Sequence, residues 1–137
     1  MSINIQYPKQ FSKEYKDFII VLSKLSELNN INNLPFDTKF LSQSKELEKN
    51  LKENLYYESF VKSNYSRSFH NIKFILLPKL KNNQYIYEGA KLFSRFNNQS
   101  IEELNFIFSN RLVNNLNNIC SNYLFGFLMR TYSFLKY

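Results

Sequence analysis

Two short apolar runs constrain the fold of this chain more than any other feature. Residues 17–23 read Asp-Phe-Ile-Ile-Val-Leu-Ser, and residues 71–78 read Asn-Ile-Lys-Phe-Ile-Leu-Leu-Pro. A short apolar run bounded by polar residues is typical of a strand that is buried on both faces. Pro78 ends the second run because a proline cannot donate to a central ladder. We therefore predict two strands here, the second of them central in the sheet.

Three segments follow helical spacing. They are residues 37–54, residues 85–96 and the longest segment, residues 112 to about 133. Asp37 or Thr38 can cap the start of the first helix. Apolar residues recur in them at three- and four-residue steps, which predicts amphipathic helices. These positions are Phe40, Leu47, Leu51, Leu55, Ile86, Ala90, Leu92, Phe93, Phe96, Val113, Leu116, Cys120, Tyr123, Leu124, Phe127, Leu128 and Thr131.

Two further segments alternate with the two-residue period of a strand. Residues 57–64 place Tyr57 and Val61 on one side and Phe60 and Lys62 on the other, which predicts an exposed or edge strand. Residues 103–109 predict a strand with at least one face in the core. The order strand, helix, strand, strand, helix, strand, helix predicts a single α/β domain over residues 1–137, with helices covering a mostly parallel or mixed sheet.

Composition narrows the functional classes. Hydrophobic residues make up 44% of the chain and aromatic residues 18%, which is enough for a packed core. The net charge of +7 favours solubility and a weak attraction to nucleic acid, but the excess is scattered, and the one basic run is Lys9, Lys13 and Lys16. The N-terminus does not resemble a signal peptide, and no stretch is apolar enough to span a bilayer. We expect a cytoplasmic protein without membrane partners.

The residues that most catalytic sites require are scarce. Gly89 and Gly126 are the only glycines, so a glycine-rich phosphate loop is excluded. His70 is the only histidine, and its position before a strand predicts a solvent-exposed turn residue without triad partners. One histidine and one cysteine cannot complete an ordinary zinc site. No catalytic residue, cofactor site or metal site is therefore assigned, and no cofactor is expected.

The remaining reactive groups have unreactive interpretations. Cys120 lies in the apolar stripe of the last helix, which predicts a buried, inert thiol. The carboxylates that could bind magnesium or transfer protons are expected on solvated surfaces. They are Glu46, Glu48, Glu53, Glu102 and Glu103. One aromatic and basic cluster could stack nucleic-acid bases. It contains Tyr56, Tyr57, Tyr65 and Arg67.

Residues 124–137 form an apolar segment that contains Gly126 and runs into Tyr-Ser-Phe-Leu-Lys-Tyr. This segment resembles the junction helix of the N-terminal domain of the leucyl (cytosol) aminopeptidase family, an apolar helix that runs into Tyr-Arg-Phe-Asp-Lys-Tyr-Lys; Ser133 and Leu135 depart from that pattern. The matching residues of this junction motif are Tyr132, Phe134, Lys136 and Tyr137. Residues 72–81 occupy the place of the family's strand that usually ends in Gly-Leu-Gly-Lys, with Pro78 and Lys79 in place of that glycine turn. Residues 87–93 are similar to the helix that follows this strand in the family.

The resemblance implies a macro-domain-like, three-layer α/β fold with helices on both faces of the sheet, in which residues 112–137 form the terminal helix and the start of a linker. Complete enzymes of the family add a two-metal peptidase domain and form hexamers. The metal-binding motifs of that domain would lie beyond Tyr137, so no catalytic residue is carried over to this chain.

Three functional hypotheses follow. The chain is a non-catalytic assembly or regulatory domain, or a truncated remnant, of a leucyl aminopeptidase; its partner would then be an aminopeptidase catalytic domain. Alternatively, it is a small basic module that binds nucleic acid through residues 56–67. The third hypothesis is an oligomerising protein whose last helix presents Phe125, Phe127, Met129 and Phe134 to another chain.

Overall fold

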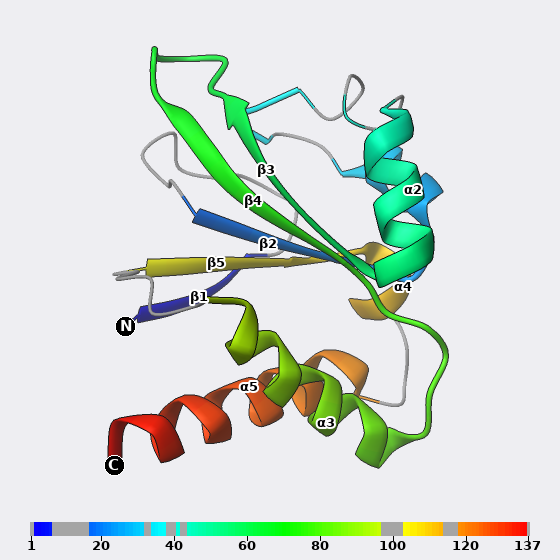
Figure 1. Ribbon diagram of the computed structural model, residues 1–137, viewed down its shortest axis with the longest axis vertical. Helices are drawn as coiled ribbons and strands as arrows, with labels where there is room; N and C mark the ends of the chain where they lie inside the picture. The colour runs from blue at the N-terminus through cyan, green and yellow to red at the C-terminus, as the bar shows by residue number, and fades with distance from the viewer. Residues whose placement is uncertain are drawn as a thin grey trace. The chain divides into compact units, whose positions relative to one another are not determined.

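A computed structural model describes residues 2–6, 17–31, 34–37, 41, 44–96, 103–113 and 118–136 (Figure 1). The chain forms two compact units. The first comprises Met1–Pro78 and Ile101–Asn110, and the second comprises Lys79–Ser100 and Arg111–Tyr137. The first unit holds the sheet, and the second is helical.

In the described part of the chain, five strands form one mixed, mostly parallel sheet. They are β1 (Ser2–Gln6), β2 (Asp17–Leu22), β3 (Tyr56–Lys62), β4 (Phe69–Leu76) and β5 (Glu103–Phe108). Their order is β1-β5-β2-β4-β3, and only β3 runs antiparallel, against β4. The predicted α/β class with a mixed, mostly parallel sheet is confirmed, as are the central position of β4 and the edge position of β3. The strand β1 was not predicted.

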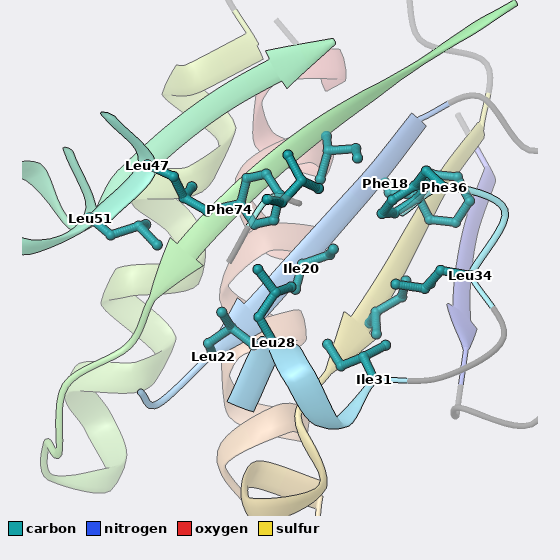
Figure 2. Close-up of a cluster of buried hydrophobic side chains, with 13 residues drawn as sticks. Phe18, Ile20, Leu22, Leu28, Ile31, Leu34, Phe36, Leu47, Leu51 and Phe74 are labelled. Atoms are coloured by element: carbon teal, nitrogen blue, oxygen red, sulfur yellow. The ribbon is translucent and has the colours of Figure 1, made fainter. Parts of the chain in front are cut away.

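One face of the sheet carries the hydrophobic core of the first unit (Figure 2). Phe18, Ile20 and Leu22 of β2 point to this face because side chains two residues apart share a side of a strand. The face is covered by the 3₁₀ helix η1 (Leu25–Asn30), by Ile31, Leu34 and Phe36, and by helix α2 (Lys45–Asn54). Leu47 and Leu51 of α2 are fully buried there, as their spacing predicts.

Helix α2 begins later than the sequence predicted. Its N-cap is Ser44, whose Oγ accepts a hydrogen bond from the backbone N–H of Leu47, so the predicted start at Asp37 is wrong. A serine hydroxyl at the N-cap supplies the acceptor that the first turn of a helix lacks. Thr38 and Phe40, the other residues predicted at this end, lie outside the described residues. The helix ends at Leu55, which adopts the left-handed conformation.

The second unit contains helix α3 (Asn82–Phe93), continued by η2 (Ser94–Phe96), and helix α5 (Ile119–Lys136). The backbones of α3 and α5 approach closely at the two glycines of the chain. A Cβ atom on Gly89 would lie 1.8 Å from the carbonyl oxygen of Tyr123, and one on Gly126 would lie 1.8 Å from that of Ile86. Both glycines are therefore required by the helix crossing.

The last predicted helix is correct in its core but wrong at its start. A separate short helix, α4 (Asn110–Val113), precedes it, and α5 begins at Ile119 after Asn118, which has a φ of 54°. A residue in the left-handed region interrupts a helix, and asparagine tolerates that region better than most residues. Tyr123, Leu124 and Phe127 of α5 are buried, as the predicted apolar stripe requires.

Candidate functional site

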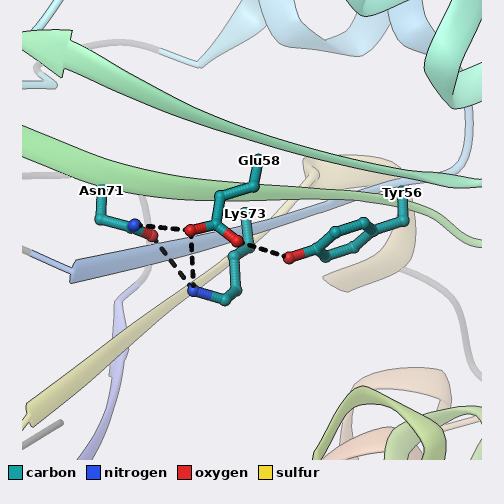
Figure 3. A network of polar contacts seen from close by, with 4 residues as sticks. All are labelled: Tyr56, Glu58, Asn71 and Lys73. Atoms are coloured by element: carbon teal, nitrogen blue, oxygen red, sulfur yellow. Dashed lines mark hydrogen bonds and ion pairs between the residues drawn. The ribbon is translucent and has the colours of Figure 1, made fainter. Parts of the chain in front are cut away.

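A polar network lies on the sheet face opposite the core of the first unit (Figure 3). Pairing of β3 with β4 places Glu58 opposite Lys73. Glu58 accepts hydrogen bonds from Asn71 Nδ2 at 2.8 Å and from the Tyr56 hydroxyl at 3.0 Å. The Lys73 ammonium lies 3.2 Å from Asn71 Oδ1 and 3.7 Å from Glu58 Oε1. Four side chains from two strands therefore share one closed network.

Burial and charge act against each other in this network. The Lys73 side chain is 2% exposed, and this burial lowers its pKa, although Glu58 and Asp17 oppose the shift. Burial alone would raise the pKa of Glu58, but hydrogen bonds from Asn71 and Tyr56 and the charge of Lys73 outweigh it, so the pKa is lowered. Glu58 is therefore ionised at neutral pH and compensates the buried ammonium.

The network suits strand pairing better than catalysis. A lysine with a lowered pKa is the kind of amine that attacks a carbonyl group, but a substrate must reach its Nζ atom. The 2% exposure of this side chain prevents that approach. Its contacts instead join the edge strand β3 to β4. This lysine was not among the predicted site residues, although a cation inside the apolar run of residues 71–78 indicates a buried, compensated charge.

A buried carboxylate, Glu27, lies near the carboxyl end of β2, where parallel sheets often bind ligands. Its Oε1 accepts hydrogen bonds from the backbone N–H groups of Ser23 at 2.6 Å and Lys24 at 3.0 Å, and its Oε2 accepts one from the Ser23 hydroxyl at 2.7 Å. Burial opposes ionisation, but these bonds lower the pKa of Glu27. The carboxylate caps η1, and sequence analysis did not identify it.

The tip of the β3–β4 hairpin exposes aromatic and basic side chains. Phe60, Tyr65 and Phe69 are 67%, 59% and 58% exposed. Lys62 and Arg67 are exposed beside them. We call these five residues the hairpin surface. Beside it, a cavity of about 340 Å³ is lined by Phe60, Lys62, Asp37, Leu41, Ser59 and Val61.

Hydrogen bonds fix the turn of this hairpin. The Asn64 N–H donates to the carbonyl oxygen of Pro35 at 2.8 Å, and the Ser63 N–H donates to that of Ser68 at 3.0 Å. The Tyr65 N–H donates to the buried Ser63 hydroxyl at 3.1 Å. The turn is therefore held both within itself and against residues 34–36.

The structure changes the composition of the aromatic cluster predicted at residues 56–67. Tyr65 and Arg67 are exposed, as stacking and phosphate contacts require. Tyr56 and Tyr57 are partly buried: the first bonds Glu58, and the second stacks on Phe74 with a ring-centroid distance of 6.5 Å. Phe60 and Phe69 were missed. Side chains alternate between the two faces of a strand, so Phe60 and Tyr57 point to opposite faces of β3. This alternation could have indicated that Phe60 is exposed.

The prediction that His70 is an exposed turn residue is wrong. The residue lies in β4, is 1% exposed and packs its ring 5.5 Å from those of Phe18 and Phe36. Antiparallel pairing extends β4 to Phe69, two residues before the predicted start, and directs His70 toward the core.

The predicted carboxylates and the thiol occupy unreactive positions where they are described. Glu46 and Glu53 are exposed on α2, and Glu48 pairs with Lys52 at 2.7 Å. Glu102 lies outside the described residues, and Glu103 belongs to β5. Cys120 is half-buried, and burial raises its pKa to about 11. A thiol with a raised pKa is a poor nucleophile at neutral pH.

Helix α5 carries both the junction motif and an exposed apolar stripe. Phe125, Leu128 and Met129 are about half exposed, whereas Phe127 is fully buried, so its predicted presentation to a partner is wrong. Tyr132, Phe134 and Lys136 of the junction motif fall in the last turns of α5. Tyr137 lies outside the described residues, as does the basic run Lys9, Lys13 and Lys16.

Comparisons with known proteins assign no family to this chain. No family model matches its sequence, and neither a curated protein nor a solved structure matches it. Within the described ranges, no three or more histidine, cysteine or acidic side chains gather in a way that could hold a metal ion. The helices described here all lack the combination of length and apolarity that a bilayer crossing requires.

Proposed function

We propose that this chain is a non-catalytic α/β domain that acts by binding, of the kind that precedes the catalytic domain of leucyl aminopeptidases. The observation that carries the proposal is that the charged side chains inside the sheet unit make contacts that stabilise the fold. Glu27 caps η1, and the Glu58–Lys73 pair joins β3 to β4. These groups serve the fold, and the ammonium of Lys73 is closed to a substrate.

Two sequence features connect this binding role to the aminopeptidase family. The elements follow the order strand, helix, strand, strand, helix, strand, helix that underlies the resemblance, after an additional first strand. Helix α5 also carries Tyr132, Phe134 and Lys136 of the junction motif. In the family, such a helix leads from the accessory domain toward the peptidase domain and contributes to assembly.

An activity assay tests the non-catalytic part of the proposal. The purified chain is incubated with leucine amide and Mn²⁺, with a complete leucyl aminopeptidase as the positive control. We expect no turnover above buffer. Hydrolysis that copurifies with the chain and is absent from a mock preparation would overturn the proposal.

A chimera tests the assembly part. Residues 1–137 replace the N-terminal domain of a hexameric leucyl aminopeptidase, and sedimentation velocity compares the chimera with the parent enzyme and with its catalytic domain alone. We expect the chimera to form hexamers that hydrolyse leucine amide. A folded chimera that assembles no better than the isolated catalytic domain would contradict the assignment to this family.

A further inference from the structure

We propose that the hairpin surface binds single-stranded nucleic acid, with bases stacked on Phe60 and Phe69 and phosphates held by Lys62 and Arg67. Three aromatic side chains within ten residues are each more than half exposed. Single exposed apolar residues are ordinary on a protein surface, but a group of them indicates a partner. Phe60 and Phe69 lie on paired strands, which gives these two rings a firm support.

The charge of the hairpin selects an anionic partner. Residues 59–76 contain Lys62, Arg67 and Lys73 and no aspartate or glutamate. Glu58 compensates the buried Lys73, so the positive charge presented to solvent comes from Lys62 and Arg67. Aromatic rings beside exposed cations are the combination that proteins use to hold single-stranded nucleic acid, because every base offers a π-face and every nucleotide a phosphate.

Strand register determines how the rings are spaced. Phe60 pairs with Asn71 and Lys62 pairs with Phe69, so the two phenylalanines are diagonal neighbours on one face of the hairpin. Such neighbours lie about 7–8 Å apart. That separation is about twice the 3.4 Å rise per base of a stacked strand. The two rings therefore fit bases of an extended strand, whereas the base faces of a duplex are covered by their neighbours.

The surface is also organised before binding. Six residues of β4 pair with β2, and the turn is fixed by the hydrogen bonds of Ser63 and Asn64. Among the described residues, the hairpin continues past the first residue of β2, Asp17, which pairs with Asn71 (Figure 1). A partner can approach this projecting end without displacing β2. Binding to a rigid surface avoids the entropy cost of ordering the hairpin.

Fluorescence anisotropy of the full chain with a labelled 20-nucleotide poly(dT) tests the proposal, with poly(U) as a second ligand. We compare the wild type with the double variants Phe60→Ala/Phe69→Ala and Lys62→Ser/Arg67→Ser. Removing a stacking ring should weaken binding about 5- to 100-fold per ring. Removing both cations should reduce the slope of log affinity against log salt by about 1.4.

Matched variants separate stacking from general stickiness and from misfolding. The variant Phe60→Leu/Phe69→Leu keeps apolar side chains and should still lose affinity, because leucine has no π-face. The control variant Tyr87→Ala/Lys91→Ser removes another aromatic and basic pair and should bind normally. Tyr87 is 64% exposed, and the Lys91 ammonium lies 5.6 Å from the centroid of its ring. Circular dichroism must show that all variants are folded.

Several results would overturn the proposal. These are no binding at 50 mM salt, an equal loss in the Tyr87/Lys91 control, or full affinity in the Phe60→Leu/Phe69→Leu variant. Binding to a 20-base-pair duplex as tight as to poly(dT) would refute the single-strand claim. Binding only to phosphatidylserine vesicles, or self-association that depends on the hairpin surface without nucleic-acid binding, would assign the surface to a membrane or to a second copy of the chain.

Discussion

The two glycines of the chain should be the positions at which the smallest possible substitution causes a disproportionate loss of stability. In a helix interior, replacing glycine with alanine normally stabilises by about 1 kcal/mol, because alanine restricts the unfolded chain and favours the helix. The crossing of α3 and α5 should reverse that sign. At Gly126 the added methyl group would lie 1.8 Å from the carbonyl oxygen of Ile86.

The magnitude follows from this distance. An added Cβ atom makes ordinary van der Waals contact at 3.4–4 Å, so the methyl carbon and the carbonyl oxygen must move apart by roughly 2 Å. The obstructing atom belongs to the backbone, so no change of rotamer relieves the overlap. Overpacking typically costs about 1–3 kcal/mol, and the forced displacement places this case near the upper end. After the helix-propensity gain, Gly126→Ala should lower the free energy of unfolding by about 1–2 kcal/mol.

Urea unfolding followed by circular dichroism at 222 nm measures this loss, and Ser121 provides the control. That residue is exposed on the same helix, so Ser121→Ala should be more stable than Ser121→Gly by about 1 kcal/mol. The glycine–alanine difference should therefore have opposite signs at positions 121 and 126. Equal signs at the two positions would refute the close helix crossing. Gly89→Ala should repeat the result, since its clash is with the backbone of Tyr123.

Three other predictions concern charge and burial. Glu58→Gln should destabilise the chain by about 3 kcal/mol, because, of the two negative charges that act on the 2%-exposed Lys73 side chain, Glu58 and Asp17, it removes the one with the larger effect. Lys73→Met should cost only about 1–2 kcal/mol, because Glu58 is 26% exposed and keeps two hydrogen bonds. The reverse order in urea unfolding would contradict this account. The pKa values of Glu27 and Glu58 are lowered from 4.5, so the unfolded chain binds more protons than the folded chain as the pH falls below about 5. The free energy of unfolding should therefore decrease in this pH range. A free energy of unfolding that stays constant between pH 6 and pH 3 would argue against both networks. Burial raises the pKa of Cys120 from 9.0 to about 11. Its thiol should therefore react with iodoacetamide at pH 8 roughly one hundred times more slowly than a free cysteine. A rate equal to that of the unfolded chain would show that the thiol is not buried.

The parts of the fold that the sequence predicted are those with strong local patterns. The run Phe-Ile-Ile-Val-Leu of β2 leaves little alternative to a buried strand, and the stripe of α2 at Leu47 and Leu51 defines the face that packs on the sheet. β1 was missed because its five residues, Ser-Ile-Asn-Ile-Gln, are short and half polar, and its pairing with β5 joins segments about one hundred residues apart. Long-range pairing of this kind leaves only a weak local pattern in a sequence.

The polar networks and the hairpin surface were harder to predict because both depend on strand register. The apolar run around Lys73 indicates burial, but the sequence does not show which residues contact Lys73 and Lys62. Register places Lys73 opposite Glu58 and Lys62 opposite Phe69 near the hairpin turn. His70 illustrates the same point, since moving the start of β4 by two residues changes a turn residue into a core residue. Exposure of an aromatic ring likewise depends on which elements cover it.

The Glu58–Lys73 ion pair and the exposed rings of Phe60 and Phe69 are linked, because both depend on the register of β3 against β4. A slip of β3 by one residue would turn all of its side chains to the opposite face. Glu58 would then face the apolar side that contains Ile72 and Phe74, and Lys73 would lose its contact with that carboxylate. Phe60 would turn away from the face that it shares with Phe69. The Glu58–Lys73 pair thus penalises every odd register of the edge strand. If the hairpin surface binds single-stranded nucleic acid, Glu58→Gln should weaken that binding indirectly, by allowing other registers of β3. The loss of affinity should become smaller at low temperature or with added osmolyte, because the native register is then repopulated.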